Sequence, residues 1–317
     1  MKNSALTFLL LALTAALLAC SFRAQAGRAF LPINHASSLA RSRQDDDVVR
    51  VSTDLVVLNA TVIGKDGRFV SGLKRNDFQV FEDGQEQKIA TFNAEETPFA
   101  AAILLDVSGS MDTRLTLGRS AALRFLEKLR DEDVASVYSF YTKVEQWDDF
   151  SPGRDLPDKI FGLRAKTQTA LNDAVFRAAD DLSKRPEKRR AIVVLSDGGE
   201  NYSRNSSEKA LDHALAAGAT IYAVNMSPEG PYRDIAGAAI LKNFADKSGG
   251  RYIATPGGQE LRDAFSAIAE ELGHQYTLTY RPINRQHDGK WRAINLKLAR
   301  ADADLRTRKG YRSPKGP

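Results

Sequence analysis

The chain has 317 residues, 43% of them hydrophobic, and a formal net charge of +5. This composition supports an ordinary globular core, and the length allows two domains or one domain with attached segments. The positive excess is small and scattered, which argues against a nucleic-acid partner. The only cysteine, Cys20, lies near the start, so the folded part can hold no disulfide and no cysteine metal cluster. The four histidines are far apart and form no HExxH pair, so a zinc hydrolase is not expected.

The first 26 residues indicate an export signal. Lys2 gives a positive start, Ala5–Ala19 is apolar or small apart from two threonines, and Ala24–Ala26 fits an A-x-A cleavage site. The apolar run is shorter than the ~20 residues that a membrane-spanning helix needs. Alternatively, Leu17–Cys20 resembles the lipobox of bacterial lipoproteins, in which Cys20 would carry a lipid anchor. Either interpretation predicts a secreted, periplasmic or envelope-attached protein.

A spacer and a β-rich segment follow the export signal. Residues 27–47 have no periodic apolar pattern and end in the acidic run Asp45–Asp47, which predicts a flexible spacer. Residues 48–96 contain short runs rich in β-forming residues. Strands are predicted over Val51–Ile63, Phe78–Phe81 and Lys88–Phe92. These strands are too few to close a sandwich alone, so they need partners from elsewhere in the chain.

Residues 97–272 alternate between predicted strands and helices. The strands are Phe99–Val107, Val134–Tyr141, Val144–Phe150, Ala191–Leu195, Thr220–Val224 and Arg251–Ala254. The helices are Arg114–Arg130, Ala170–Leu182, Ser206–Ala217, Ile235–Lys247 and Gln259–Leu272. This alternation predicts an α/β domain with a doubly wound, mostly parallel sheet. A nucleotide site is not expected, because no G-x-G-x-x-G follows a strand and a Walker A lysine is absent.

The last segment, residues 273–317, returns to a β pattern. Strands are predicted over Tyr276–Tyr280, Trp291–Leu298 and Leu305–Tyr311. This segment also has too few strands to form an independent module, and its strands have apolar faces to bury. We therefore predict that it packs with residues 48–96 as a small β-sandwich module beside the α/β domain.

Polar residues follow two of the apolar strands where these strands end. Asp106, Ser108 and Ser110 come directly after one strand, and Asp197 comes after another. In an open α/β sheet, ligands gather in the crevice outside the carboxyl ends of the strands. Such oxygen ligands suit a hard divalent cation, Mg²⁺ in the first place, with Mn²⁺ and Ca²⁺ as alternatives.

A third loop supplies a further hydroxyl. The polar stretch Lys166–Leu171 opens a helix between the two acidic strand ends. Its hydroxyl residues are Thr167 and Thr169. Two carboxylates and three hydroxyls at one edge of the sheet would form an oxygen site.

These motifs resemble those of von Willebrand factor A domains. DVSGS at residues 106–110 matches the D-x-S-x-S motif of the family, TALNDA at residues 169–174 resembles its threonine loop, and LSDG at residues 195–198 resembles its acidic loop. The three motifs occur in the family's order, and the resemblance covers residues 97–272. It implies a metal-ion-dependent adhesion site whose Mg²⁺ ligands are Asp106, Ser108, Ser110, Thr169 and Asp197. If the threonine loop is shifted by two residues, Thr167 would replace Thr169 as the ligand.

The flanking segments carry a second resemblance. LVVLNATV and DFQVFEDG before the domain, and QYTLTY after it, are similar to a group of exported bacterial proteins common among Acidobacteria. The family resemblance also implies that the last helix, Gln259–Leu272, slides when the metal ligands rearrange. Its apolar stripe could serve such a shift between two registers, although a plain core helix explains the stripe equally well.

We expect an exported binding module, not an enzyme, that engages a protein partner through the cation. The resemblance implies that an oxygen of the partner, typically from an acidic residue, completes the site. One alternative is a structural envelope protein in which the metal only stabilises the fold. Another is a metal-dependent hydrolase, which needs a general base beside the metal. No spare His or Glu accompanies the three motifs, so hydrolysis is the weaker alternative.

Overall fold

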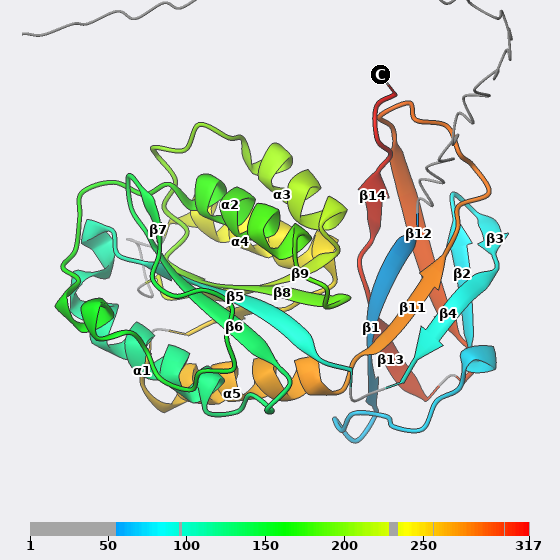
Figure 1. Ribbon diagram of the computed structural model, residues 1–317, viewed down its shortest axis with the longest axis horizontal. Coiled ribbons are helices and arrows are strands. Elements are labelled where there is room, and N and C mark those ends of the chain that lie inside the picture. Colours follow the sequence, from blue (N-terminus) through cyan, green and yellow to red (C-terminus); the bar gives the residue numbers. More distant parts are fainter. Residues whose placement is uncertain (1–54, 95–96, 228–233, 256, 301, 317) are drawn as a thin grey trace, which may run out of the picture. The chain divides into compact units, whose positions relative to one another are not determined.

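The computed structural model describes residues 55–94, 97–227, 234–255, 257–300 and 302–316 (Figure 1). These residues belong to one folded unit, residues 52–317. The predicted export signal, the spacer and Cys20 lie outside them. No helix among the described residues combines the length and the apolar character that crossing a bilayer requires.

Six strands form the central sheet of the α/β domain in the order β10-β9-β8-β5-β6-β7. Every neighbouring pair is parallel except β6 and β7, which confirms the predicted mostly parallel sheet. The strands are β5 (Phe99–Asp106), β6 (Val134–Phe140), β7 (Val144–Gln146), β8 (Arg189–Ser196), β9 (Ala219–Asn225) and β10 (Tyr252–Ala254). β5 and β8 run side by side toward the same edge, because they pair from Phe99 with Arg189 to Leu105 with Leu195.

Helices cover both faces of this sheet (Figure 1). They are α1 (Leu115–Leu126), α2 (Leu171–Ser183), α3 (Ser207–Ala216), α4 (Ile235–Ser248) and α5 (Gly258–Gly273), with the 3-10 turns η2 (Gly109–Arg114) and η3 (Asp158–Gly162). Ile103 and Leu105 of β5 belong to the core that includes α1 and α5. Ala102 and Leu104 belong to the core that includes α2, α3 and α4. The strand is therefore buried on both faces, which explains its uninterrupted apolar sequence.

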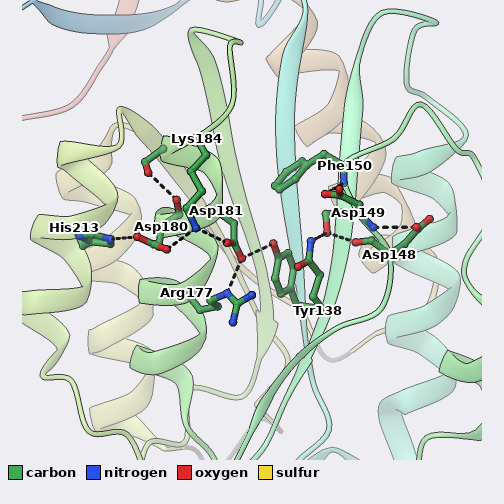
Figure 2. Close-up of polar contacts among 12 residues, drawn as sticks. Tyr138, Asp148, Asp149, Phe150, Arg177, Asp180, Asp181, Lys184 and His213 are labelled. Atoms are coloured by element: carbon green, nitrogen blue, oxygen red, sulfur yellow. Dashed lines mark hydrogen bonds and ion pairs between the residues drawn. The ribbon is translucent and has the colours of Figure 1, made fainter. Parts of the chain in front are cut away.

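Polar contacts hold α2 against the sheet (Figure 2). Tyr138 of β6 donates its hydroxyl to Asp181 Oδ2 at 3.2 Å, and Arg177 Nε donates to the same oxygen at 2.6 Å. Asp180 and Asp181 lie near the carboxyl end of the helix, where the helix dipole disfavours negative charge. Lys184 offsets this charge through contacts with both carboxylates. α2 is thereby fixed at the end far from its first turn.

Two four-stranded antiparallel sheets form a β module. The first has the order β13-β1-β11-β4, and the second has the order β14-β12-β2-β3. The elements are β1 (Val56–Gly64), η1 (Arg75–Asp77), β2 (Phe78–Glu82), β3 (Gln85–Gln87), β4 (Ile89–Asn93), β11 (Tyr276–Tyr280), β12 (Trp291–Leu298), β13 (Ala303–Arg306) and β14 (Gly310–Arg312). Both sheets mix strands from before and after the α/β domain, and one hydrophobic cluster joins them. The predicted sandwich is confirmed.

Several predicted boundaries are wrong. Leu305–Tyr311 is not one strand, because β13 pairs with β1 whereas β14 pairs with β12 in the other sheet. The three residues between them lie against the α/β domain: Lys309 N donates to Lys247 O at 2.9 Å, and Arg308 Nη1 donates to Leu215 O at 2.7 Å. This docking takes the backbone out of the first sheet before it enters the second.

Other differences concern helix and strand ends. The helix predicted from Arg114 to Arg130 is α1, Leu115–Leu126, and η2 occupies the residues before it. The strand predicted as Val144–Phe150 is only three residues long. β3 was not predicted, because Gln85–Gln87 contains no apolar residue and pairs only as the second arm of a hairpin with β2.

Arg189 joins the two points at which the chain passes between the β module and the α/β domain. Its side chain is buried and donates to Thr97 O and, at 2.8 Å, to Gln275 O. One guanidinium therefore holds both crossing segments together beside the first residue of β5.

Candidate metal site

Asp106 is the last residue of β5, and its side chain is almost completely buried, with 2% exposure. One carboxylate oxygen accepts the backbone N–H of Ser108 at 2.8 Å, and the other accepts the hydroxyl of Ser196 at 2.5 Å. Burial raises the pKa of the Asp106 carboxyl to about 7, against the opposing effect of these hydrogen bonds, and the charge of Asp197 adds to the rise. Within the described residues, its hydrogen-bond donors are thus neutral, so its negative charge is left uncompensated.

The loop after Asp106 presents the two serines. Ser108 is buried and Ser110 is exposed, and their hydroxyl oxygens are 3.1 Å apart. Lys166 N donates to Val107 O at 2.8 Å, which brings the threonine loop alongside. A Cβ atom at Gly109 would lie only 3.0 Å from Lys166 O, so the close approach of the two loops favours glycine there.

Thr169 and Asp197 both lie close to Gly199, whose backbone N–H donates to Asp197 Oδ1 at 3.1 Å. A Cβ atom at Gly199 would lie 3.3 Å from Asp197 Oδ1 and 3.5 Å from Thr169 Oγ1. Thr169 is buried, and its backbone exchanges hydrogen bonds with Asn201 at 2.9 and 3.1 Å. The threonine loop and the acidic loop are thus tied together at the residues predicted to carry ligands.

Thr167 is the alternative ligand from the sequence, and its side chain is exposed. It lies two residues before Thr169 on the same loop. The geometry favours Thr169, because that side chain is buried next to Asp197.

The acidic loop has a shape that needs glycine. Gly198 has a φ of +91°, and a Cβ atom on it would lie 2.4 Å from the carbonyl carbon of Gly237. Gly237 belongs to the first turn of α4, so that helix packs directly on the loop. Ser227 also donates its hydroxyl to Asp197 O at 2.7 Å. These contacts fix the backbone that carries Asp197.

Two further acids, Glu200 and Asp173, hold the loops next to the predicted ligands, and the sequence did not predict this role. Glu200 accepts the backbone N–H of Asn172 at 2.7 Å and so caps α2, whose own N-cap residue, Ala170, makes no side-chain bond. In return, Asp173 of α2 accepts the backbone N–H of Asn205 at 2.9 Å. An acid in the first turn of a predicted helix is the only signal that could have indicated this exchange.

The residues present fit a divalent cation that prefers oxygen. The five predicted side chains come from three loops that contact one another at the carboxyl edge of the sheet. Among the described residues, no group of three or more His, Cys, Asp or Glu side chains is placed to hold a metal. A cation at this edge would therefore rely on two carboxylates, on hydroxyls and on water, which is a set suited to Mg²⁺.

Comparison with known proteins bears on the same part of the chain. Residues 101–200 match the family model of the von Willebrand factor type A domain. This part of the chain is therefore a von Willebrand factor A domain by sequence similarity. The matched range includes Asp106, Asp197 and the three hydroxyl residues between them.

Curated relatives share part of this domain. Inter-alpha-trypsin inhibitor heavy chain H3 of Rattus norvegicus is 31% identical over 126 residues, which cover 35% of this chain and 14% of that protein. The Mus musculus protein of the same name is 28% identical over 126 residues with the same coverage. The chain therefore spans a small part of the length of these relatives.

Three solved structures show partial similarity to this chain. BatB from Bacteroides thetaiotaomicron has a TM-score of 0.44 and 18% identity, over 55% of this chain and 98% of that one. The PilB minor pilin from Streptococcus sanguinis has a TM-score of 0.45 and 16% identity, over 57% of this chain and 62% of that one. Proximal thread matrix protein 1 from the mussel byssus, with a zinc-occupied MIDAS motif, has a TM-score of 0.47 and 15% identity. The match covers 60% of this chain and 49% of that one.

Proposed function

We propose that the protein is an exported binding module that holds a protein partner through a divalent cation, Mg²⁺ in the first place. The observation that carries the proposal is Asp106, a buried carboxylate with neutral donors and a second acid, Asp197, nearby. A buried charge is costly unless an opposite charge compensates it. A divalent cation at this edge would supply that charge.

One side of the site is suited to a partner. Asp106, Ser108, Thr169 and Asp197 are buried, whereas Ser110 is exposed. The solvent-facing side of the site is therefore the side of Ser110. Mg²⁺ bound by one or two carboxylates normally keeps open positions that waters fill. A carboxylate of the partner would replace such a water and add a bond between unlike charges.

Binding is favoured over hydrolysis by the surroundings of Glu200. This acid lies three residues after Asp197, where a general base would be sought. Its Oε2 accepts from Asn172 N and Ser203 Oγ, and its Oε1 accepts from Tyr202 N and Ser203 N. Both oxygens of this carboxylate are occupied by donors of the protein, so the side chain is positioned as a cap and not to orient a water molecule.

The site is tested by calorimetric titration of Mg²⁺ into the wild type and Asp106→Ala. We expect the variant to lose measurable binding while circular dichroism shows a retained fold. The matched control is Asp112→Ala, which removes an exposed acid of the neighbouring η2 and should keep the wild-type affinity. Equal affinity in wild type and Asp106→Ala would remove this site from the proposal.

The binding role is tested separately from the metal site. A pull-down of cell-surface proteins with and without EDTA distinguishes a partner held through the cation from a cation that only stabilises the fold. Capture that is unchanged by EDTA would favour the structural role.

Export is tested by the mass of the mature protein. We expect the chain to begin at Gly27 or at a lipidated Cys20, as the first 26 residues indicate. Recovery of the chain with an intact Met1 from the cytosol would contradict export.

A further inference from the structure

Exposed large apolar side chains occur on segments that contact the loops of the candidate metal site. Among the described residues, four such side chains are strongly exposed: Phe161 (53%), Tyr202 (50%), Ile235 (79%) and Ile283 (55%). Single exposed apolar residues are ordinary on a protein surface. However, three of these four lie on segments that contact the loops of one site, whereas Ile283 lies in the β module. This concentration indicates a binding surface.

Phe161 lies in η3, and the segment around it is anchored to the core. Its neighbour Ile160 is fully buried in the core, and Leu163 O accepts Arg119 Nη2 at 2.8 Å. The same loop then reaches Lys166, which forms a bridge with Ser108. Phe161 is thus an exposed side chain between two anchored points of the backbone, Ile160 and Lys166. Lys166 in turn contacts the predicted ligand Ser108.

Tyr202 and Ile235 are anchored in the same manner. Tyr202 N donates to Thr169 O at 3.1 Å, so this residue is attached to the threonine loop. Ile235 is the first residue of α4, two positions before Gly237, which packs on Gly198 of the acidic loop. Because their backbones are fixed, these side chains would lose little backbone freedom on binding.

Two cationic side chains near the site are suited to an acidic partner, and Asp112 is an exposed acid of the same η2. Lys166 is exposed beside Ser108, and Arg114 Nη1 donates to Ser110 O at 3.4 Å. Both cations lie next to the loop that carries the two serines. A partner that carried a carboxylate would meet these positive groups as well as the cation.

We propose that the partner presents an extended protein segment in which one acidic residue is flanked by large apolar residues. The carboxylate lies on the cation, and the flanking side chains pack on Phe161, Tyr202 and Ile235. This inference rests on the proposed function and adds the chemistry of the partner to it. An isolated carboxylate would use only the cation, whereas the exposed apolar side chains give additional area to bury.

The test uses immobilised heptapeptides of the form Gly-Ser-X-Asp-X-Ser-Gly, with X as Leu, Phe, Ser or Lys. Each has a counterpart with Asn in place of Asp, and binding of the purified chain is measured in Mg²⁺ and in EDTA. We expect Leu and Phe flanks to bind at least about fivefold better than Ser flanks. This binding should require both the Asp and Mg²⁺.

Variants test whether the three exposed side chains cause the preference for apolar flanks. Phe161→Ala, Tyr202→Ala and Ile235→Ala should reduce the preference for apolar flanks without changing Mg²⁺ affinity. Ile283→Ala, a similarly exposed apolar residue on the β module, should keep it. Equal binding of Ser-flanked peptides, an unchanged preference in the three variants, or no peptide binding by Mg²⁺-loaded protein would overturn the inference. A chain that binds no Mg²⁺ would instead defeat the proposed function on which the inference rests.

Discussion

Asp106 and Glu271 are both buried carboxylates, with exposures of 2% and 0%, but their surroundings differ. Glu271 lies on α5 where the α/β domain meets the β module. It forms an ion pair with Arg306 and accepts the hydroxyls of Thr61 at 3.0 Å and Tyr222 at 2.9 Å. Asp106 accepts only from neutral groups among the described residues.

Under the proposed function, this difference separates a structural carboxylate from a metal ligand. At the junction, the protein itself supplies the opposite charge, and removing that carboxylate would leave the buried hydroxyls of Thr61 and Tyr222 without their acceptor. At the edge of the sheet, no such partner is provided, and burial raises the pKa of Asp106 to about 7. The ion pair of Glu271 stabilises the fold. The burial of Asp106 is unfavourable when this carboxylate is charged, and a bound cation would lower that free energy.

The largest expected effect is at the junction. Glu271→Ala should lower the free energy of unfolding by about 3–5 kcal/mol, because it leaves Arg306 and two hydroxyls without their acceptor. Chemical denaturation measures the change. Glu270→Ala is the matched control, since that neighbouring side chain is exposed, and its effect should stay within about 0.5 kcal/mol. Similar values for the two variants would contradict the structural role of Glu271.

The same contacts bear on the hypothesis that α5 slides. Glu271 is two residues from the end of this helix, and Arg251 also approaches it, at 3.8 Å. Any shift of α5 along its axis would separate Glu271 from Arg306 and from the two hydroxyls. The sliding of α5 stays a prediction, and the ion pair at the junction is the contact that such a shift would have to break.

A second prediction contrasts the two carboxylates by their response to Mg²⁺. At a concentration about 100 times the dissociation constant, Mg²⁺ should stabilise the wild type by about 2.7 kcal/mol, because it binds only the folded state. Asp106→Asn should gain no such stabilisation, whereas Glu271→Ala, although less stable, should gain as much as the wild type. The measurement is denaturation of each protein with Mg²⁺ and with EDTA. An equal gain in Asp106→Asn would show that the cation binds elsewhere.

A third prediction concerns pH in the metal-free protein. The folded-state pKa of Asp106, about 7, is raised above its usual value of 3.8, so the folded protein holds this proton more tightly than the unfolded chain does. The resulting stability is complete below about pH 4 and is lost as the pH rises to about 7. Relative to Asp106→Asn, the wild type should therefore become less stable over this range, by at most about 1.4 kcal/mol per pH unit.

Denaturation of both proteins in EDTA at several pH values measures this difference. Saturating Mg²⁺ should abolish the loss in the wild type, because the cation holds the carboxylate in its charged form. A difference between the two proteins that stays constant with pH would mean that the Asp106 carboxyl titrates normally.

Patterns that depend on burial alone could be predicted from the sequence. The run of apolar residues before Asp106 identified β5, because a strand covered on both faces needs no polar positions. The order of the three motifs identified the loops that carry the candidate ligands. The alternation along Trp291–Leu298 identified β12, whose side chains are alternately buried and exposed.

Features that depend on tertiary contacts could not be predicted. The brace between Glu200 and the first turn of α2 joins loops that are separated in the chain, and each residue alone resembles an ordinary surface acid. The break between β13 and β14 arises because the chain docks on the α/β domain at Arg308 and Lys309. Sequence periodicity contains no information about such docking, so Leu305–Tyr311 was predicted as one strand.

The smallest expected effect distinguishes the two threonines. Thr169→Val removes a hydroxyl that lies next to Asp197, while the similar shape of valine preserves the packing of this buried position. We expect the affinity for Mg²⁺ to fall about tenfold, a loss typical when one oxygen that binds or orients at a metal site is removed. Thr167→Val removes the exposed hydroxyl of the same loop and should leave the affinity unchanged. Calorimetric titration of both variants measures the difference, and a larger loss in Thr167→Val would mean that the loop presents Thr167 to the cation.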